Sequence, residues 1–316
     1  MVEMIGTTLP VVLIFLLGIW CRKRNFLLES SMNDIKKFII NIALPCVLIQ
    51  TFINLEIKLE YLTIIALTFS LLFILMIAGH ICNFIPKIYY RYNAYMCTGF
   101  SFGLLGMGLF SIIYGEENLA IFSIMGLAHE VFIWSIYYFI FRLDTKKEKF
   151  SIHGFLRMLK SPIIVSILLG VACNISGIGT LLYTTAIGEG LQRTMAYLAS
   201  TATPLMLLCI GYGINLSLNS LKISAKVMIV RLAVTIVVGT LFKVLIIDNI
   251  IETTMLFNVS YISFLILPPM FSLPILISEN GNKNDYEIAS SAVGIYTVIS
   301  ILVFIAFAFL VPVDML

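Results

Sequence analysis

Long apolar runs alternate with short polar segments along nearly all of the 316 residues of the chain. Each run is roughly 20 residues long, which is the length an α-helix needs to cross the hydrocarbon core of a bilayer. The pattern therefore predicts an all-α membrane protein. Its ten predicted spans cover residues 4–21, 34–54, 61–85, 94–113, 119–141, 161–179, 191–214, 224–247, 253–278 and 286–311.

The composition agrees with this pattern, with 60% hydrophobic residues, 12% charged residues and a mean hydropathy of +1.04. A soluble domain carries about twice that share of charged residues. The longest polar stretch covers only residues 142–160, so we expect no soluble domain. The first apolar run follows Met1-Val2-Glu3 with no basic segment before it, so we expect a true first span and not a cleaved signal peptide.

The chain lacks the usual signatures of enzymes, metal sites and disulfide frameworks. It contains no G-x-x-x-x-G-K-[ST] phosphate-binding loop, and His129-Glu130 does not begin a zinc-protease motif because Ile133 stands where the second histidine would be. We expect no enzyme, no catalytic residue, no cofactor and no metal site. The six cysteines have no metal-type spacing and are expected to be packing residues: Cys21, Cys46, Cys82, Cys97, Cys173 and Cys209.

Basic residues gather after the odd-numbered spans, which predicts the orientation of the chain. This group consists of Arg22, Lys23, Arg24, Lys36, Lys37, Lys87, Arg91, Arg142, Lys146, Lys147, Lys149, Arg157, Lys160, Lys222, Lys226 and Lys283, whereas the opposite loops hold only Lys58 and Arg193. Both termini are therefore expected outside the cell, in a multi-pass protein of the plasma membrane. The high usage of Ile, Lys and Asn is typical of an AT-rich bacterial genome.

Two pairs of spans repeat each other in sequence. Residues 10–21 and 162–173 share a proline, Leu-Leu-Gly and a cysteine at identical spacing. Spans 2 and 7 each carry a proline, Pro45 and Pro204, and each ends in Ile-Asn-Leu. Because a repeat of five spans is odd, its second copy must be inverted in the membrane, as in many secondary transporters.

The predicted organisation follows from this inverted repeat. The first copy covers residues 1–141 (helices 1–5), the basic cytoplasmic linker covers 142–160, and the second copy covers 161–316 (helices 6–10).

Two of the spans are predicted to be interrupted. Span 9 holds Pro268 and Pro269 near its middle, and proline removes a backbone donor and clashes with the preceding turn. Its partner by symmetry is span 4, which carries four glycines in ten residues, at 99, 103, 106 and 108. Glycine weakens a helix by roughly 1 kcal/mol relative to alanine. The alternative for span 4 is a packing face of small residues.

The motifs of the chain resemble those of the auxin efflux carrier family, which includes bacterial malate permeases and plant auxin carriers. Asn41-Ile-Ala-Leu-Pro45 is similar to its N-x-x-L-P motif, and Ala202-Thr-Pro204-Leu with Ile210-Gly211 is similar to its A-T-P-L…G segment. Pro269 with Ser278-Glu279 and Thr297-Val-Ile-Ser300 looks like its signature in spans 9 and 10. The resemblance covers the whole chain in the right order.

This resemblance implies a ten-helix 5+5 inverted repeat in which broken helices 4 and 9 cross at the substrate site. Helices 1, 2, 6 and 7 would form a scaffold, with Asn41, Pro45, Thr203 and Pro204 on the scaffold side of the site. Helices 3–5 and 8–10 would form a moving transport domain. A homodimer through the scaffold helices is also implied.

Span 4 departs from the family pattern at two positions. Ser101, Gly103, Gly106 and Gly108 stand at the asparagine, first glycine, second glycine and proline of G-N-x-G-x-x-G-x-P. The asparagine contacts the substrate carboxylate in plant relatives, so its loss bears on which substrate is carried. The residues expected to bind substrate at the crossing are Ser101, Phe102, Gly103, Gly106, Gly108, Pro268, Pro269, Met270 and Leu273.

Ionisable residues inside spans are costly and are candidates for function. His129 and Glu130 lie near the middle of span 5 and are the expected ion-coupling residues, for a proton or for sodium, the alternative being a glutamate satisfied by neighbouring polar groups. Lys243 is expected to extend to the headgroups. Arg231 is expected either to do the same or to pair with an acid.

These features predict a secondary active transporter of small organic anions such as carboxylates, with elevator-type alternating access. The positive amide ends of crossing half-helices favour an anion. The alternatives are a passive uniporter or channel-like carrier, and a sodium-coupled carrier of a non-carboxylate solute. The expected partners are the anion and the lipid bilayer, and no nucleic acid.

Overall fold

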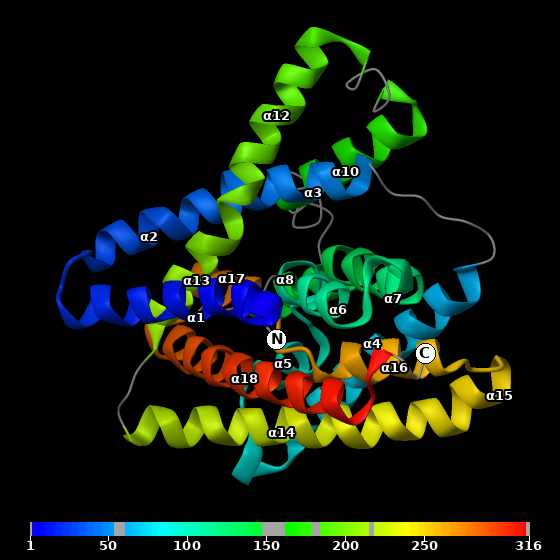
Figure 1. Cartoon of the computed structure of the whole chain (residues 1–316). Coiled ribbons are helices and arrows are strands. Elements are labelled where there is room, and N and C mark those ends of the chain that lie inside the picture. The colour runs from blue at the N-terminus through cyan, green and yellow to red at the C-terminus, as the bar shows by residue number, and fades with distance from the viewer. Residues whose placement is uncertain (1, 54–60, 147–161, 179–183, 215–217, 314–316) are drawn as a thin grey trace.

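The computed structural model describes residues 2–53, 61–146, 162–178, 184–214 and 218–313, and every regular element in these ranges is a helix (Figure 1). In chain order the elements are α1 (Val2–Lys23), α2 (Glu29–Phe38), η1 (Ile39–Ala43), α3 (Leu44–Ile53), α4 (Leu62–Ile81), η3 (Cys82–Phe84), η4 (Pro86–Ile88), α5 (Asn93–Thr98), η5 (Phe102–Gly106), α6 (Met107–Tyr114), η6 (Glu116–Asn118), α7 (Leu119–Phe132), η7 (Ile133–Tyr137), α8 (Tyr138–Lys146), α10 (Pro162–Ile175), α12 (Ala186–Ser200), α13 (Ala202–Gly213), α14 (Leu218–Phe242), η8 (Lys243–Ile247), α15 (Asp248–Ile250), α16 (Met255–Ile266), α17 (Ser272–Asn280) and α18 (Lys283–Leu310). The predicted all-α class is confirmed for these residues.

Six helices in the described ranges are long and apolar enough to cross a membrane. They are Glu29–Ile53, Leu62–Phe84, Leu119–Thr145, Ala186–Gly213, Ser220–Ile250 and Lys283–Leu310, and they coincide with predicted spans 2, 3, 5, 7, 8 and 10. Pro162–Ile175 and Met255–Ile266 are shorter apolar helices. The protein is therefore a multi-pass membrane protein, and the count of ten spans stays a prediction.

Both expected interruptions are present. Between α5 and η5 the chain leaves the helical conformation at Gly99, and between α16 and α17 it does so at Leu267, whose φ and ψ are −57° and 144°. The two breaks are bonded to each other: the Ser101 amide donates to the Pro268 carbonyl at 2.8 Å and its Oγ donates to the Pro269 carbonyl at 2.7 Å. Each break thus satisfies backbone groups that the other leaves free.

Helices α1 and α13 pack at a close glycine contact. A Cβ on Gly18 would clash with backbone atoms of Leu208, Tyr212 and Gly211 in α13, and a Cβ on Gly211 would clash with the Phe15 carbonyl in α1. The helices α3 and α10 also lie side by side, and there Gly170 faces Phe52 and Ile49. A second set of contacts joins α4 to α5, α7 and α14, and α14 to α18, which lies beside it in Figure 1.

Side chains that directly follow the two similar segments 10–21 and 162–173 cap two of these helices. Arg22 follows Cys21 and donates to the carbonyls of Tyr212, Gly213 and Ile214, at 3.2, 3.2 and 3.0 Å, at the end of α13. Asn174 follows Cys173 and donates to the Ile53 carbonyl at the end of α3, at 2.7 Å. Carbonyls at helix ends lack partners within the helix, so each cap stabilises its helix end.

The glycine contact predicts a stability effect. Gly18→Ala forces α1 away from α13, so we expect a loss of about 1–3 kcal/mol, as for other overpacked sites. The measurement is the thermal melting temperature of the purified protein. Gly190→Ala in α12 is the control, because a Cβ there meets nothing within 4 Å and should leave the stability unchanged or slightly higher. Equal melting temperatures for Gly18→Ala and the wild type would contradict the predicted contact.

Candidate functional site

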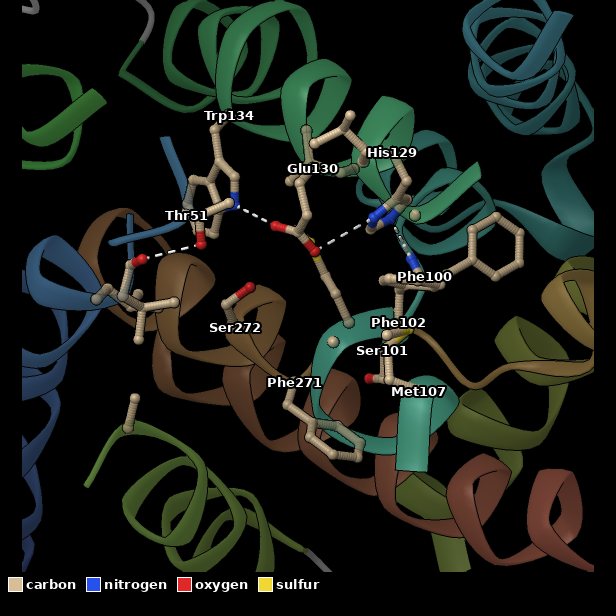
Figure 2. Close-up of a pocket in the computed structure, with 18 of the residues that line it drawn as sticks. Thr51, Phe100, Ser101, Phe102, Met107, His129, Glu130, Trp134, Phe271 and Ser272 are labelled. Carbon is tan, nitrogen blue, oxygen red and sulfur yellow. Dashed lines mark hydrogen bonds and ion pairs between the residues drawn. The ribbon is translucent and has the colours of Figure 1, made fainter. Parts of the chain in front are cut away.

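A cavity of about 320 Å³ lies between α3 and α13 on one side and η5, α7, η7 and α17 on the other (Figure 2). Its wall is mostly apolar with a few polar side chains. The lining residues are Leu44, Val47, Thr51, Phe100, Ser101, Phe102, Gly103, Met107, Ser123, Gly126, Leu127, His129, Glu130, Ile133, Trp134, Ala202, Met206, Met270, Phe271 and Ser272. An apolar cavity with a few convergent polar groups is typical of a small-molecule site.

His129 is fixed in α7 by a backbone donor from the first interruption. It is 1% exposed, and its Nε2 accepts a hydrogen bond of 3.0 Å from the Phe100 amide. A nitrogen that accepts carries no proton in the neutral imidazole, so the proton lies on Nδ1. That Nδ1 is 3.5 Å from Glu130 Oε1. The imidazole therefore lies between the broken segment, to which it is hydrogen-bonded, and the carboxylate.

Glu130 lies between two N–H groups at the edge of the cavity. Its Oε2 accepts a 2.8 Å hydrogen bond from the Trp134 indole, one turn further along, while its Oε1 faces His129. The side chain keeps 28% of its surface exposed, and in Figure 2 its carboxylate points from α7 toward Ser272 on α17. It is the one carboxylate among the described residues that line the cavity.

The N-terminal ends of two helices also face the cavity. Phe102 and Gly103 begin η5, which continues into α6, and Phe271 and Ser272 begin α17. The first amides of a helix have no partner within it, and the helix dipole gives this end a partial positive charge. The two second halves of the interrupted segments thus present donors to the cavity.

A buried guanidinium lies at the C-terminal ends of the two helices that precede the interruptions, α5 and α16. Arg231 of α14 is 0% exposed, and its Nη1 donates to the Met96 carbonyl and, at 3.0 Å, to the Gly99 carbonyl. Its Nη2 donates to the Leu267 carbonyl at 3.1 Å. Both expectations for Arg231 are therefore wrong, because the buried guanidinium donates through Nη1 and Nη2 to backbone carbonyls and forms no ion pair with an acid among the described residues. Lys243 pairs with Asp248 at 2.7 Å.

Six of the predicted site residues line the cavity: Ser101, Phe102, Gly103, Met270, His129 and Glu130. The others at the interruptions lie behind its wall. The carbonyls of Pro268 and Pro269 accept hydrogen bonds from Ser101, and Leu273 is fully buried. Gly106 faces the Leu267 side chain, and the Gly108 carbonyl accepts from Ser111.

The predicted scaffold residues do not line the cavity. Asn41 is exposed and donates to the Lys37 carbonyl at 2.8 Å; Pro204 is also exposed. Pro45 is buried in α3 and Thr203 is half-buried in α13.

Other residues of the same helices line the cavity instead. Leu44, Val47 and Thr51 of α3 share one helical face, as do Ala202 and Met206 of α13. Sequence reasoning also missed Trp134, although its spacing of four from Glu130 puts both on one face of a helix.

A family model described as "Membrane transport protein" matches residues 3–308 of the chain. No curated protein matches the sequence. The match spans the helices that form the cavity and both interruptions, in agreement with the motifs in spans 2, 7, 9 and 10. The chain therefore belongs to the auxin efflux carrier / membrane transport family.

Proposed function

We propose that this protein is a secondary active transporter of small organic anions, with carboxylates as the first choice, and that it works by elevator-type alternating access. One observation carries the proposal: the amide ends of two interrupted helices and a histidine–glutamate pair face the same cavity. Backbone donors suit an anion, and the surrounding apolar wall suits the hydrocarbon part of an organic acid.

The protein can still bind an anion although serine replaces the family asparagine at position 101. Ser101 uses its Oγ to donate to the Pro269 carbonyl, so its side chain holds the two interruptions together. The amides of the first turns at Phe102 and Ser272 are part of the backbone and do not depend on the side chain at 101. We therefore assign anion binding chiefly to backbone donors.

Glu130 supports proton coupling. An ionised carboxylate and an anionic substrate in one apolar cavity repel each other strongly, because the dielectric constant there is low. Protonation of the His129–Glu130 pair removes this repulsion, so the anion and a proton favour each other's binding. Linkage makes the coupling reciprocal, and the anion is carried together with a proton.

The helix packing supports an inverted repeat and an elevator. Span 1 packs on span 7 and span 6 packs on span 2, which is the pairing that a two-fold relation between the repeats requires. The caps by Arg22 and Asn174 are equivalent in the same sense. The cavity lies between α3 and α13, assigned to the scaffold, and η5, α7 and α17, assigned to the transport domain.

The predicted orientation and the homodimer through the scaffold helices belong to the same proposal. Labelling of a single cysteine placed at either end of the chain with an impermeant reagent tests the orientation. Modification only after the membrane is opened would contradict it. Chemical crosslinking of the protein in its native membrane tests the homodimer, and the absence of a dimer band would contradict it.

A passive uniporter is the second candidate, since the family match does not specify coupling. The two functions differ in their response to a proton gradient. A uniporter needs no titratable group in its cavity, so its flux would be insensitive both to an imposed pH difference and to neutralisation of Glu130.

The first test of the proposal is Glu130→Gln in proteoliposomes. Glutamine keeps the shape and the acceptor for Trp134 but cannot exchange a proton, so carboxylate uptake should lose its acceleration by an inward proton gradient. We expect at least about tenfold less gradient-driven uptake, the factor that corresponds to about 1.4 kcal/mol of coupling. Glu189→Gln is the control, because Glu189 is exposed on α12, does not line the cavity and pairs with Arg193 four residues on. Wild-type uptake indifferent to the gradient would favour the uniporter.

The second test fills the cavity at Gly103. Gly103 lines the cavity and a Cβ at this glycine meets nothing within 4 Å, so we expect Gly103→Leu to extend its side chain into the cavity. We expect an unchanged melting temperature but no further stabilisation by the carboxylate that stabilises the wild type best, chosen from a panel of mono- and dicarboxylates, indole acids and neutral analogues. Gly190→Leu on α12, also in open space, should retain the ligand response. An intact response in Gly103→Leu would place the ligand elsewhere.

A further inference from the structure

We propose that Arg231 serves as a built-in cation at the carbonyl ends of the two interrupted spans, so that transport proceeds without Na⁺. The inference deepens the proposed function and rests on it only in assuming that the cavity carries a solute. It addresses the coupling ion, which neither the motifs nor the family identifies.

The carbonyls that meet at Arg231 come from both interruptions. Met96 and Gly99 lie at the C-terminal end of α5, and Leu267 lies at the C-terminal end of α16. Helix C-terminal ends carry a partial negative charge, and in transporters with broken helices such ends and unwound carbonyls coordinate the coupling Na⁺. Here their negative charge is neutralised by a side chain of a third helix, α14.

The surroundings of the guanidinium are those of a permanent structural charge. Its central carbon is 4.6 Å from the centre of the Phe100 ring and 5.3 Å from that of Tyr296, so aromatic faces cover it. Within the described residues, no carboxylate forms an ion pair with it. Arginine stays protonated in proteins, so this charge is not released during a transport cycle. Arg231 is therefore a positioning residue and not a proton carrier.

Phe100 separates this charge from the cavity. Its ring packs on Arg231, while its amide donates to His129, whose imidazole faces Glu130. In Figure 2 the Phe100 ring points away from the Glu130 carboxylate. Arg231 does not line the cavity, so it contributes a positive potential there without contacting the solute. We thus assign the fixed cation to the ring side of Phe100 and the exchangeable proton to the side of its amide.

The test compares cations in the absence of any substrate. The melting temperature of the purified wild type should be the same in NaCl and in choline chloride of equal ionic strength. Arg231→Ala should melt lower and should recover in part on addition of guanidinium at low, non-denaturing concentration, or of Na⁺. Arg231→Lys should lie between the two and should not respond to Na⁺. Lys243→Ala, twelve residues further along the same long helix Ser220–Ile250, is the control and should show no cation response.

The transport measurement uses the same variants in proteoliposomes. Wild-type carboxylate uptake should be equal with and without Na⁺, and uptake by Arg231→Ala should fall roughly tenfold or more, with recovery in added guanidinium. A Na⁺-specific rise in the wild-type melting temperature or uptake would overturn the inference. So would an Arg231→Ala variant with normal uptake. If Arg231→Ala does not fold, the wild type and Arg231→Lys still decide the outcome. If no acid is carried, the proposed function fails while the substrate-free melting comparison still tests Arg231.

Discussion

The satisfaction of backbone groups at the two interruptions is the constraint on which the rest of the structure depends. Hydrocarbon offers no hydrogen bonds, so a helix that breaks inside a membrane must find partners for its carbonyls and amides within the protein. Arg231 donates hydrogen bonds to carbonyls at the ends of α5 and α16, and Ser101 bonds the two breaks to each other. The first residues of η5 and α17 line the cavity, and the first amides of a helix have no partner within the helix. The interruptions therefore leave donors where a solute can reach them.

The electrostatics of the cavity follow from this division. A permanent positive charge lies behind Phe100, and the carboxylate of Glu130 lies in front of it, linked through His129. Charges in a medium of low dielectric constant interact over longer distances than they do in water. Under the proposed function, a bound anion, the Glu130 carboxylate and the residues 99–101 therefore influence one another. This mutual influence is the physical basis that we propose for coupling a solute to a proton.

Around this site, the close packing of α1 on α13 and of α3 on α10 provides a rigid frame. Glycine at 18 and 211 lets two backbones approach within van der Waals contact, which strengthens packing where no hydrophobic effect drives helices together. Arg22 and Asn174 cap the ends of the same helices. In the proposed elevator mechanism, this frame is the part that stays fixed while the helices on the other side of the cavity move.

The sequence by itself determined the features that depend on neighbouring residues. Apolar runs define membrane helices by their length, and Pro268-Pro269 and the glycines of 99–108 break helices through their own backbone chemistry. Four of the predicted site residues that line the cavity followed from these breaks, namely Ser101, Phe102, Gly103 and Met270, whereas His129 and Glu130 were recognised as ionisable residues inside an apolar span. The remaining wall of the cavity depends on which helix faces meet: Val47 and Thr51 line it while Asn41, on the same span, is exposed. The partners of Arg231 are the clearest example of a feature that the sequence does not reveal. They are backbone carbonyls 36 to 135 residues away, and every residue has a backbone carbonyl. Only the tertiary structure decides which of those carbonyls are left free beside it.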